Sequence, residues 1–479
     1  MVVVFVLIGL IVLGLLAGTH LYLWRRLVRD VSAPRSGWRR LGTVPAVLLP
    51  VTTLGALVSG RAGAPFLTEQ IFAWPGFLWL ACLLYLTLAL LAGELVRFVL
   101  RRTPWGRARS VQAPATESAP AVVEPAPVAE PVTPAGGPAV TPAGGPAVTP
   151  AGGPSPSAGA AVPTDAAAES GHAVAESTAT GSTEAGPEAG PHPDEPHTVP
   201  LAAPVSSRRV FLARTLAVTA GAAGLGTTAA GAYSVLNGPT LKHVTVPLAK
   251  LGRRTHGYRV AVVSDIHLGP ILGRGHTRRI VDAINGTQPD LVTIVGDLVD
   301  GSVAHLGPAA EPLRELRSRH GTFFVTGNHE YFGDARAWID HLRELNVHPL
   351  ENARRELPGF DLAGVNDLAG EEQGEGPDFD RALRDRDAER ACVLMAHQPV
   401  QIHEAVDHGV DLQLSGHTHG GQLWPGNHLA ALANPTVAGL ERYGDTQLYV
   451  TRGAGAWGPP VRVGADSDIT VVTLAAKKA

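Results

Sequence analysis

Five short blocks in the second half of the amino-acid sequence share one pattern: AVVSDIHLG (residues 261–269), VTIVGDLVD (292–300), FFVTGNHE (323–330), VLMAH (393–397) and LQLSGHTHGG (412–421). In each block an apolar run, typical of a buried strand, leads into polar residues. The runs predict strands over 259–263, 291–295, 322–325, 392–396 and 412–414. Helical patterns at 278–284 and 335–345 lie between them. This alternation indicates an α/β layered domain, which we place at residues 240–479.

Each predicted strand ends in side chains of the types that bind metal ions. In extended backbone, residues i and i+2 point the same way, so the sequence predicts that Asp265 pairs with His267 and that His417 pairs with His419. Carboxylate, amide and imidazole ligands without thiolate suit Mn, Fe or Zn and disfavour a structural zinc site. The full set at the five strand ends is Asp265, His267, Asp297, Asp300, Asn328, His329, His397, His417 and His419.

In this order, the motifs D-x-H, G-D-x-x-D, G-N-H-E, a lone histidine and G-H-x-H resemble the calcineurin-like metallophosphoesterase superfamily. The resemblance covers nearly all of residues 240–479, and residues 452–462 resemble its bacterial, membrane-associated branch, some members of which carry twin-arginine (Tat) export signals. It implies a four-layer α/β/β/α sandwich with two divalent metal ions at the strand ends.

The resemblance also implies a role for each residue. The first metal would be held by Asp265, His267 and His419, and the second by Asn328, His397 and His417. Asp297 would bridge both, His329 would protonate the leaving oxygen, and Asp300 would orient the ring of His329. The nucleophile would be a hydroxide between the two metals.

Five residues near these blocks keep two interpretations each. Glu330 either supports the ligands or begins a helix on the first interpretation, and binds a metal on the second. Arg274 and Arg462 are either exposed arginines or contacts to a phosphate. Trp424 and Trp457 either form an apolar lip near the site or pack inside the domain.

The sequence predicts that residues 1–102 form a membrane region. Apolar stretches at 2–23, 41–58 and 71–92 predict three transmembrane helices, of which the first lacks the basic start of a signal peptide. Arginines cluster after the first and third stretches, whereas the loop between the second and third holds only Arg61. The positive-inside rule therefore places the N-terminus outside and residue 102 inside.

Residues 103–206 are predicted to be a disordered linker. From Val111 onward the segment has no lysine, arginine or aromatic residue, and it repeats TPAGGPAV at Thr133 and Thr141. Without large side chains to bury, such a segment cannot offset its chain entropy.

Residues 207–236 begin with SRRVFL (207–212) and continue in a weakly apolar run. This resembles a twin-arginine export signal, which implies the Tat machinery as a partner and a cleavage site at 230–232. The alternative is a fourth transmembrane helix. Both interpretations place residues 240–479 outside the cytoplasmic membrane.

Composition removes other classes of protein. The net charge of −4 argues against a nucleic-acid-binding surface, and two cysteines, Cys82 and Cys392, exclude a disulfide scaffold.

From the motifs and the predicted topology together, we expect a multi-pass protein of the cell membrane that hydrolyses phosphodiester, phosphomonoester or pyrophosphate bonds on its outer side. Its location makes lipid-linked or envelope phosphates reasonable substrates. The alternative is a membrane sensor or scaffold whose metal-binding domain is not catalytic.

Overall fold

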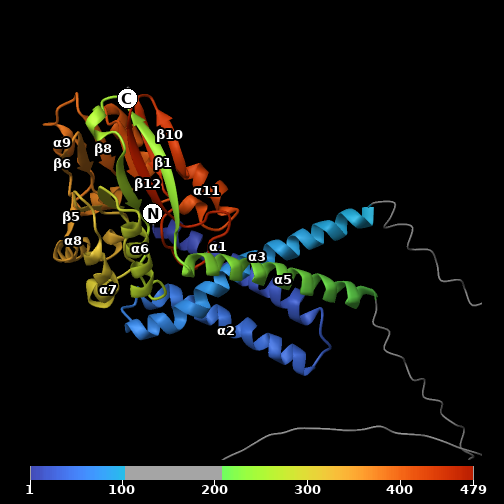
Figure 1. Cartoon of the computed structure of the whole chain (residues 1–479). Helices are drawn as coiled ribbons and strands as arrows, with labels where there is room; N and C mark the ends of the chain where they lie inside the picture. Colours follow the sequence, from blue (N-terminus) through green and yellow to red (C-terminus); the bar gives the residue numbers. More distant parts are fainter. Residues whose placement is uncertain (1, 103–207, 478–479) are drawn as a thin grey trace, which may run out of the picture. The chain divides into compact units, whose positions relative to one another are not determined.

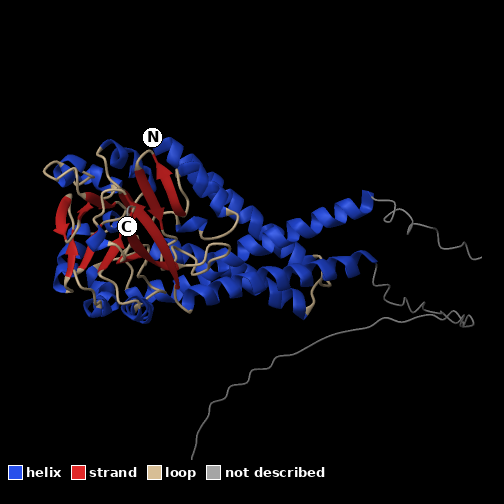
Figure 2. Ribbon diagram, turned by 45° about the horizontal axis from the view of Figure 1, so that its top comes forward, coloured by secondary structure: helices blue, strands red, loops and turns tan. Residues whose placement is uncertain are grey.

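The computed structural model describes residues 2–102 and 208–477 (Figures 1 and 2). The predicted linker, 103–206, lies outside the described residues, as does Ser207 of the twin-arginine motif. Within the described residues, long helices make up the N-terminal region and both sheets belong to the C-terminal region.

Helices are present over the three stretches that the sequence predicts to cross the membrane. They are α1 (Val2–Trp24), α2 (Gly37–Ser59) and α3 (Phe66–Arg102), and α1 continues into a π-helical turn at Arg25–Arg29. A further helix, α5 (Arg208–Leu236), leads into the C-terminal region. Each of the four contains a segment long and apolar enough to cross a membrane, which identifies a membrane protein.

Two six-stranded sheets form the centre of the C-terminal region. The first has the order β1 (Thr240–Leu248), β12 (Asp468–Ala476), β2 (Tyr258–Val263), β3 (Leu291–Val295), β4 (Thr322–Val325) and β5 (Val347–Pro349). The second has the order β10 (Gly439–Tyr443), β11 (Thr446–Val450), β9 (Leu412–Ser415), β8 (Ala391–Met395), β7 (Phe360–Gly364) and β6 (Ala353–Leu357). Strands β2 to β5 run parallel, as do β7, β8, β9 and β11, so their carboxyl ends meet at shared edges.

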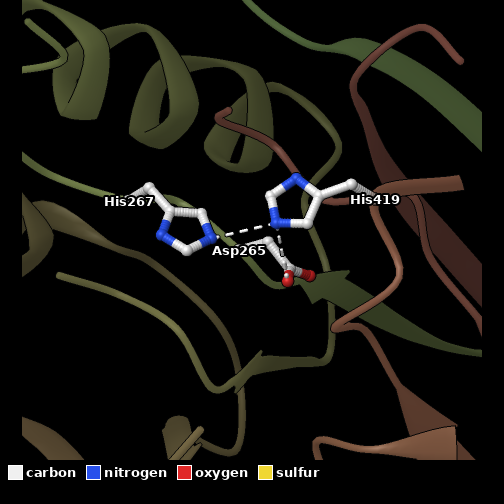
Figure 3. Close-up of side chains that lie close together, drawn as sticks. All are labelled: Asp265, His267 and His419. Atoms are coloured by element: carbon white, nitrogen blue, oxygen red, sulfur yellow. Dashed lines mark hydrogen bonds and ion pairs between the residues drawn. The ribbon is translucent and has the colours of Figure 1, made fainter. Parts of the chain in front are cut away.

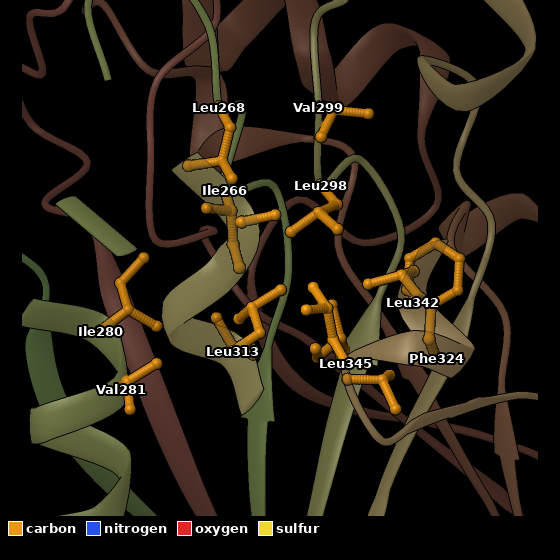
Figure 4. Packing of buried hydrophobic residues seen from close by; sticks show 14 of the residues in the cluster. Ile266, Leu268, Ile280, Val281, Leu298, Val299, Leu313, Phe324, Leu342 and Leu345 are labelled. Atoms are coloured by element: carbon orange, nitrogen blue, oxygen red, sulfur yellow. The ribbon is translucent and has the colours of Figure 1, made fainter. Parts of the chain in front are cut away.

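Three apolar clusters hold four layers together. Alternate residues of β2 point to opposite faces: Val260 and Val262 join a core between the two sheets, whereas Ala261 and Val263 pack under helices. Those helices are α6 (Arg274–Gly286), α7 (Val303–Ala310) and α8 (Ala335–Glu344), and Figure 4 shows part of their core. The second sheet is covered by α9 (Phe379–Leu383) and α10 (Ile402–Asp407). The predicted α/β/β/α sandwich is confirmed, and burial on both faces explains why the strands read as unbroken apolar runs.

Candidate metal centre

The candidate ligands lie in tight loops beyond the strands. Strand β2 ends at Val263 and β9 at Ser415, each before its D-x-H or H-x-H pair. Left-handed backbone, which is uncommon outside glycine, occurs at Asp265 (φ 50°), His267 (48°), Asp297 (50°), His417 (72°) and His419 (51°). Asp265 and His267 do converge in one group of side chains, but His417 and His419 fall into two different groups, and our assumption that extended backbone aligns the pairs is wrong. Five left-handed residues concentrated here mark a strained functional site.

The first group of side chains consists of Asp265, His267 and His419, all buried (Figure 3). The Nε2 atoms of the two histidines lie 3.0 Å apart, and His419 Nε2 lies 3.4 Å from Asp265 Oδ1. Burial disfavours a charge on His267, but neighbouring carboxylates, led by Asp300, outweigh it and raise the pKa to about 9. The distances of 3.0 Å and 3.4 Å show that ligand atoms from two distant loops face one point.

The second group consists of Asp297, His397 and His417, with Asn328 beside them. His397 Nε2 lies 3.2 Å from Asp297 Oδ2, and His417 Nδ1 lies 3.0 Å from Asn328 Oδ1. His397 Nδ1 is 2.8 Å from the carbonyl oxygen of Val295, which can only accept. The ring therefore donates through Nδ1, which leaves Nε2 to face the site.

Asp300 holds two of the histidines in place. Its Oδ1 atom lies 2.8 Å from His267 Nδ1 and 2.7 Å from His329 Nδ1. Burial would raise the pKa of Asp300, but the two imidazoles prevail and lower it to about 2. The anionic carboxylate accepts from both Nδ1–H groups, so Nε2 of each ring points toward the site. Asp300 contacts His329 as expected, and it also contacts His267, which sequence reasoning missed.

Glu330 supports the loops around Asp297. Its buried carboxylate accepts the backbone N–H groups of Asp297 (3.1 Å), Leu298 (2.8 Å) and Gly327 (2.6 Å). Burial and the charge of Asp297 raise the pKa of Glu330 to about 7, against the effect of these donors. Any side chain on Gly327 would collide with Asp297, which explains the glycine in the G-N-H-E block. Glu330 both supports the ligand loops and begins a 3-10 turn, in agreement with the first of its interpretations.

Arg462 is neither an exposed arginine nor a phosphate contact, so both interpretations of it are wrong. It is 2% exposed, and its guanidinium lies 3.0 Å from His419 Nδ1 while donating to the carbonyl oxygens of Gly455, His419 and Ala465. Its charge adds to burial in holding the pKa of His419 well below its usual range. No sequence pattern marked this contact, because the two residues meet only through the fold. Arg274 donates to the carbonyl oxygen of Pro308.

The residues present fit a divalent metal centre. His397 Nε2 is fully buried and has no hydrogen-bond partner, although its ring is aimed at Asp297. An orphaned buried nitrogen of this kind is costly unless a cation or water completes it. Within each of the two groups the ligand atoms lie within 4.8 Å of one another. Imidazole and carboxylate ligands without thiolate suit transition-metal dications.

A family model for calcineurin-like phosphoesterases matches residues 258–421, which contain both groups. An uncharacterized metallophosphoesterase of Helicobacter pylori is 39% identical over 250 residues, covering 52% of this chain and 67% of that protein. One from Aquifex aeolicus is 33% identical over 52% of this chain and 97% of its own length. The chain belongs to the metallophosphoesterase family.

A relative from Danio rerio, a transmembrane protein with metallophosphoesterase domain, is 39% identical over 259 residues. That match covers 50% of this chain and 59% of the relative, so the chain spans about three fifths of its length. Among solved structures, a dimetal phosphatase from Danio rerio aligns over 46% of this chain and 93% of its own, at 13% identity and a TM-score of 0.31. That structural likeness is too distant to carry an argument.

Proposed function

We propose that the protein is a binuclear metal-dependent phosphohydrolase that cleaves phosphodiester, phosphomonoester or pyrophosphate bonds outside the cytoplasmic membrane. The observation that carries this proposal is the position of Asp297. Its Oδ2 atom lies 3.7 Å from His267 Nε2 in the first group and 3.2 Å from His397 Nε2 in the second. One carboxylate between two ligand clusters is the arrangement that two neighbouring cations require.

These groups support the ligand assignment that the family resemblance implies. Asp265, His267 and His419 would hold one cation, Asn328, His397 and His417 the other, and Asp297 both. When bound, two such cations supply Lewis acidity and the positive charge that stabilises an in-line phosphoryl displacement. Mn, Fe and Zn all fit the ligand set.

His329 would act as the general acid. Asp300 accepts its Nδ1–H and so leaves Nε2 to face the site, 4.0 Å from Asp297 Oδ2. The ring keeps 11% of its side-chain surface exposed, whereas the rings of His267 and His397 have none. His329 can therefore reach a leaving oxygen, and Asp300 is the residue that positions it.

Location supports the proposed substrate class. We place the catalytic region on the outer side, where lipid-linked or envelope phosphates occur, and the Tat machinery is the partner proposed for its export. The part of α5 before the candidate cleavage site packs on that region, because Arg462 donates its backbone N–H to the carbonyl oxygen of Gly231 and a Cβ atom on Gly231 would lie 2.6 Å from the carbonyl oxygen of Arg462. These contacts favour retention of α5 as a fourth transmembrane helix over cleavage after Ala232.

Asp297→Asn tests the proposal. The change removes the charge shared by both sites, so we expect hydrolysis by the full chain, loaded with Mn or Fe, to fall by roughly 10²–10³-fold or more. The substrates are an aryl phosphomonoester, an aryl phosphodiester and a nucleotide-sugar pyrophosphate. Asp385→Asn, on a side chain that is 87% exposed, is the matched control. Two bound metals per chain without turnover of any substrate would favour the scaffold alternative.

A further inference from the structure

Two exposed aromatic side chains lie beside His329 at the metal centre. The rings of Phe332 and Trp457 lie 4.9 Å and 5.7 Å from the ring of His329. Gln422 connects Trp457 to the loop after His419, since its amide donates to the Trp457 carbonyl oxygen (2.9 Å) and accepts the Trp457 N–H (3.0 Å). Yet Phe332 is 73% exposed and Trp457 is 58% exposed, so neither ring is a core residue.

The same loop continues into an apolar helix whose leucine side chains are exposed. Helix α11 (Gly426–Ala433) has the sequence GNHLAALA and no buried residue. Leu429 is 70% and Leu432 84% exposed, and Trp424, just before the helix, is 52% exposed. From His417 to Leu440 the sequence contains no aspartate, glutamate, lysine or arginine. Exposing the leucine side chains of an uncharged surface helix to water costs free energy, which indicates an apolar partner.

This surface adjoins the membrane helices. The Tyr85 hydroxyl of α3 donates to the carbonyl oxygen of Trp424 (3.2 Å). Gln70 of the same helix donates to the carbonyl oxygen of Pro270, and Phe66, at its start, stacks on His305 with ring centroids 5.3 Å apart. The segment Phe66–Val99 of α3 is one of the candidate spans. The exposed apolar side chains therefore continue a surface that already requires lipid.

We propose that an apolar rim, consisting of Phe332, Trp424, Leu429, Leu432 and Trp457, docks on the interfacial region of the bilayer that α1, α2, α3 and α5 span. Tryptophans favour the headgroup level, and leucines of an uncovered helix favour the acyl boundary below it. The substrate is then a membrane-embedded amphiphile whose phosphate reaches His329 while its chains stay in lipid. This substrate class rests on the proposed hydrolase function; the docking does not.

A second copy of the chain is a less suitable occupant. A stable interface between proteins uses about 20–30 residues on each side, and the rim has five large side chains. The rim also contains no charged side chain that would fix the register of a protein partner.

Collision accessibility of a spin label tests the docking without reference to activity. The full chain, with Cys82→Ala to remove the half-buried thiol of α3, carries a nitroxide at Leu432→Cys and is placed in lipid nanodiscs. The matched control carries the label at Asp385→Cys, a side chain that is 87% exposed. We expect position 432 to be more accessible to lipid-soluble oxygen than to a water-soluble nickel chelate, and position 385 to show the reverse.

Two results would overturn the docking. Equal access of the nickel chelate to positions 432 and 385 would leave α11 in water. Low access of both reagents to position 432, together with dipolar coupling between two labels, would mean that a second copy covers the helix.

Activity tests the substrate class. For the Leu429→Glu/Leu432→Glu variant we measure turnover of a long-chain phosphoester in vesicles and of a short-chain soluble ester with the same headgroup. We expect the ratio of the two rates to fall by roughly tenfold or more, because two carboxylates would have to enter the interface. An unchanged ratio would overturn the amphiphile. If neither ester is cleaved even by the parent chain, the hydrolase proposal fails, while the spin-label result still decides the docking.

Discussion

At the scale of single residues, Glu330 offers a test of how the site is held together. Glutamine at this position keeps one acceptor oxygen but turns an NH₂ group toward backbone donors, of which Glu330 now accepts three. A buried donor left without a partner costs about 1–3 kcal/mol. We therefore expect Glu330→Gln to lower the unfolding temperature of the detergent-solubilised chain and its metal content. Glu344→Gln, on a side chain that is 73% exposed, is the control and should change neither.

A second residue, His276, should make stability depend on pH. It is 2% exposed, and burial, together with the charges of Arg279 and Arg462, lowers its pKa from 6.5 to about 4. Between these values the unfolded chain binds a proton that the folded chain does not, so the free energy of unfolding falls as the pH falls. The loss from about pH 7 to about pH 5 is about 2 kcal/mol.

Thermal unfolding at the two pH values measures this term. The His276→Asn variant cannot take up the proton in either state, so its stability should change less between them than that of the parent. The other histidines are present in both proteins and cancel in the comparison. An equally steep loss in the variant would show that His276 is not responsible.

At the scale of elements, the packing of α5 on α3 depends on a close approach at Gly224. A Cβ atom on Gly224 would lie 2.8 Å from the backbone nitrogen of Leu86 and 2.9 Å from its Cα. Small residues commonly allow such contacts between membrane helices. We expect Gly224→Val to destabilise the detergent-solubilised protein by about 1–3 kcal/mol, measured by thermal unfolding. A Cβ atom on Gly226 would meet no neighbouring element of the described structure within 4 Å, so Gly226→Val should be nearly neutral; equal losses would contradict the packing argument.

At the scale of the whole molecule, the four candidate spans and the arginine distribution predict the topology. With the N-terminus outside, four crossings place residues 240–479 outside as well. A reporter enzyme that is active only outside the membrane should therefore be active after Ala479 and inactive when inserted after Gly153. The reverse pattern would refute the arginine argument, and activity at both positions would mean that the segment before Gly153 also lies outside.

The sequence by itself determined the α/β layers and the ligand types. Parallel strands buried on both faces must be apolar throughout, so β3 and β4 were predicted with their observed bounds, Leu291–Val295 and Thr322–Val325. Two membrane helices, α1 and α2, were placed to within a few residues, because lipid demands a long apolar run. Both patterns, the apolar strands and the long apolar runs, are local along the chain. Each can therefore be recognised from the sequence without knowledge of the fold.

Only the tertiary structure decided how those residues meet. His267 and His419 are 152 positions apart in the sequence, and their nitrogens come within 3.0 Å because loops from two different sheets converge. The left-handed backbone that aims them, the burial of Arg462 behind His419 and the exposure of the apolar rim likewise depend on contacts between distant segments. Hydrophobic periodicity records which face of an element is buried, but it carries no information about which distant side chain lies opposite.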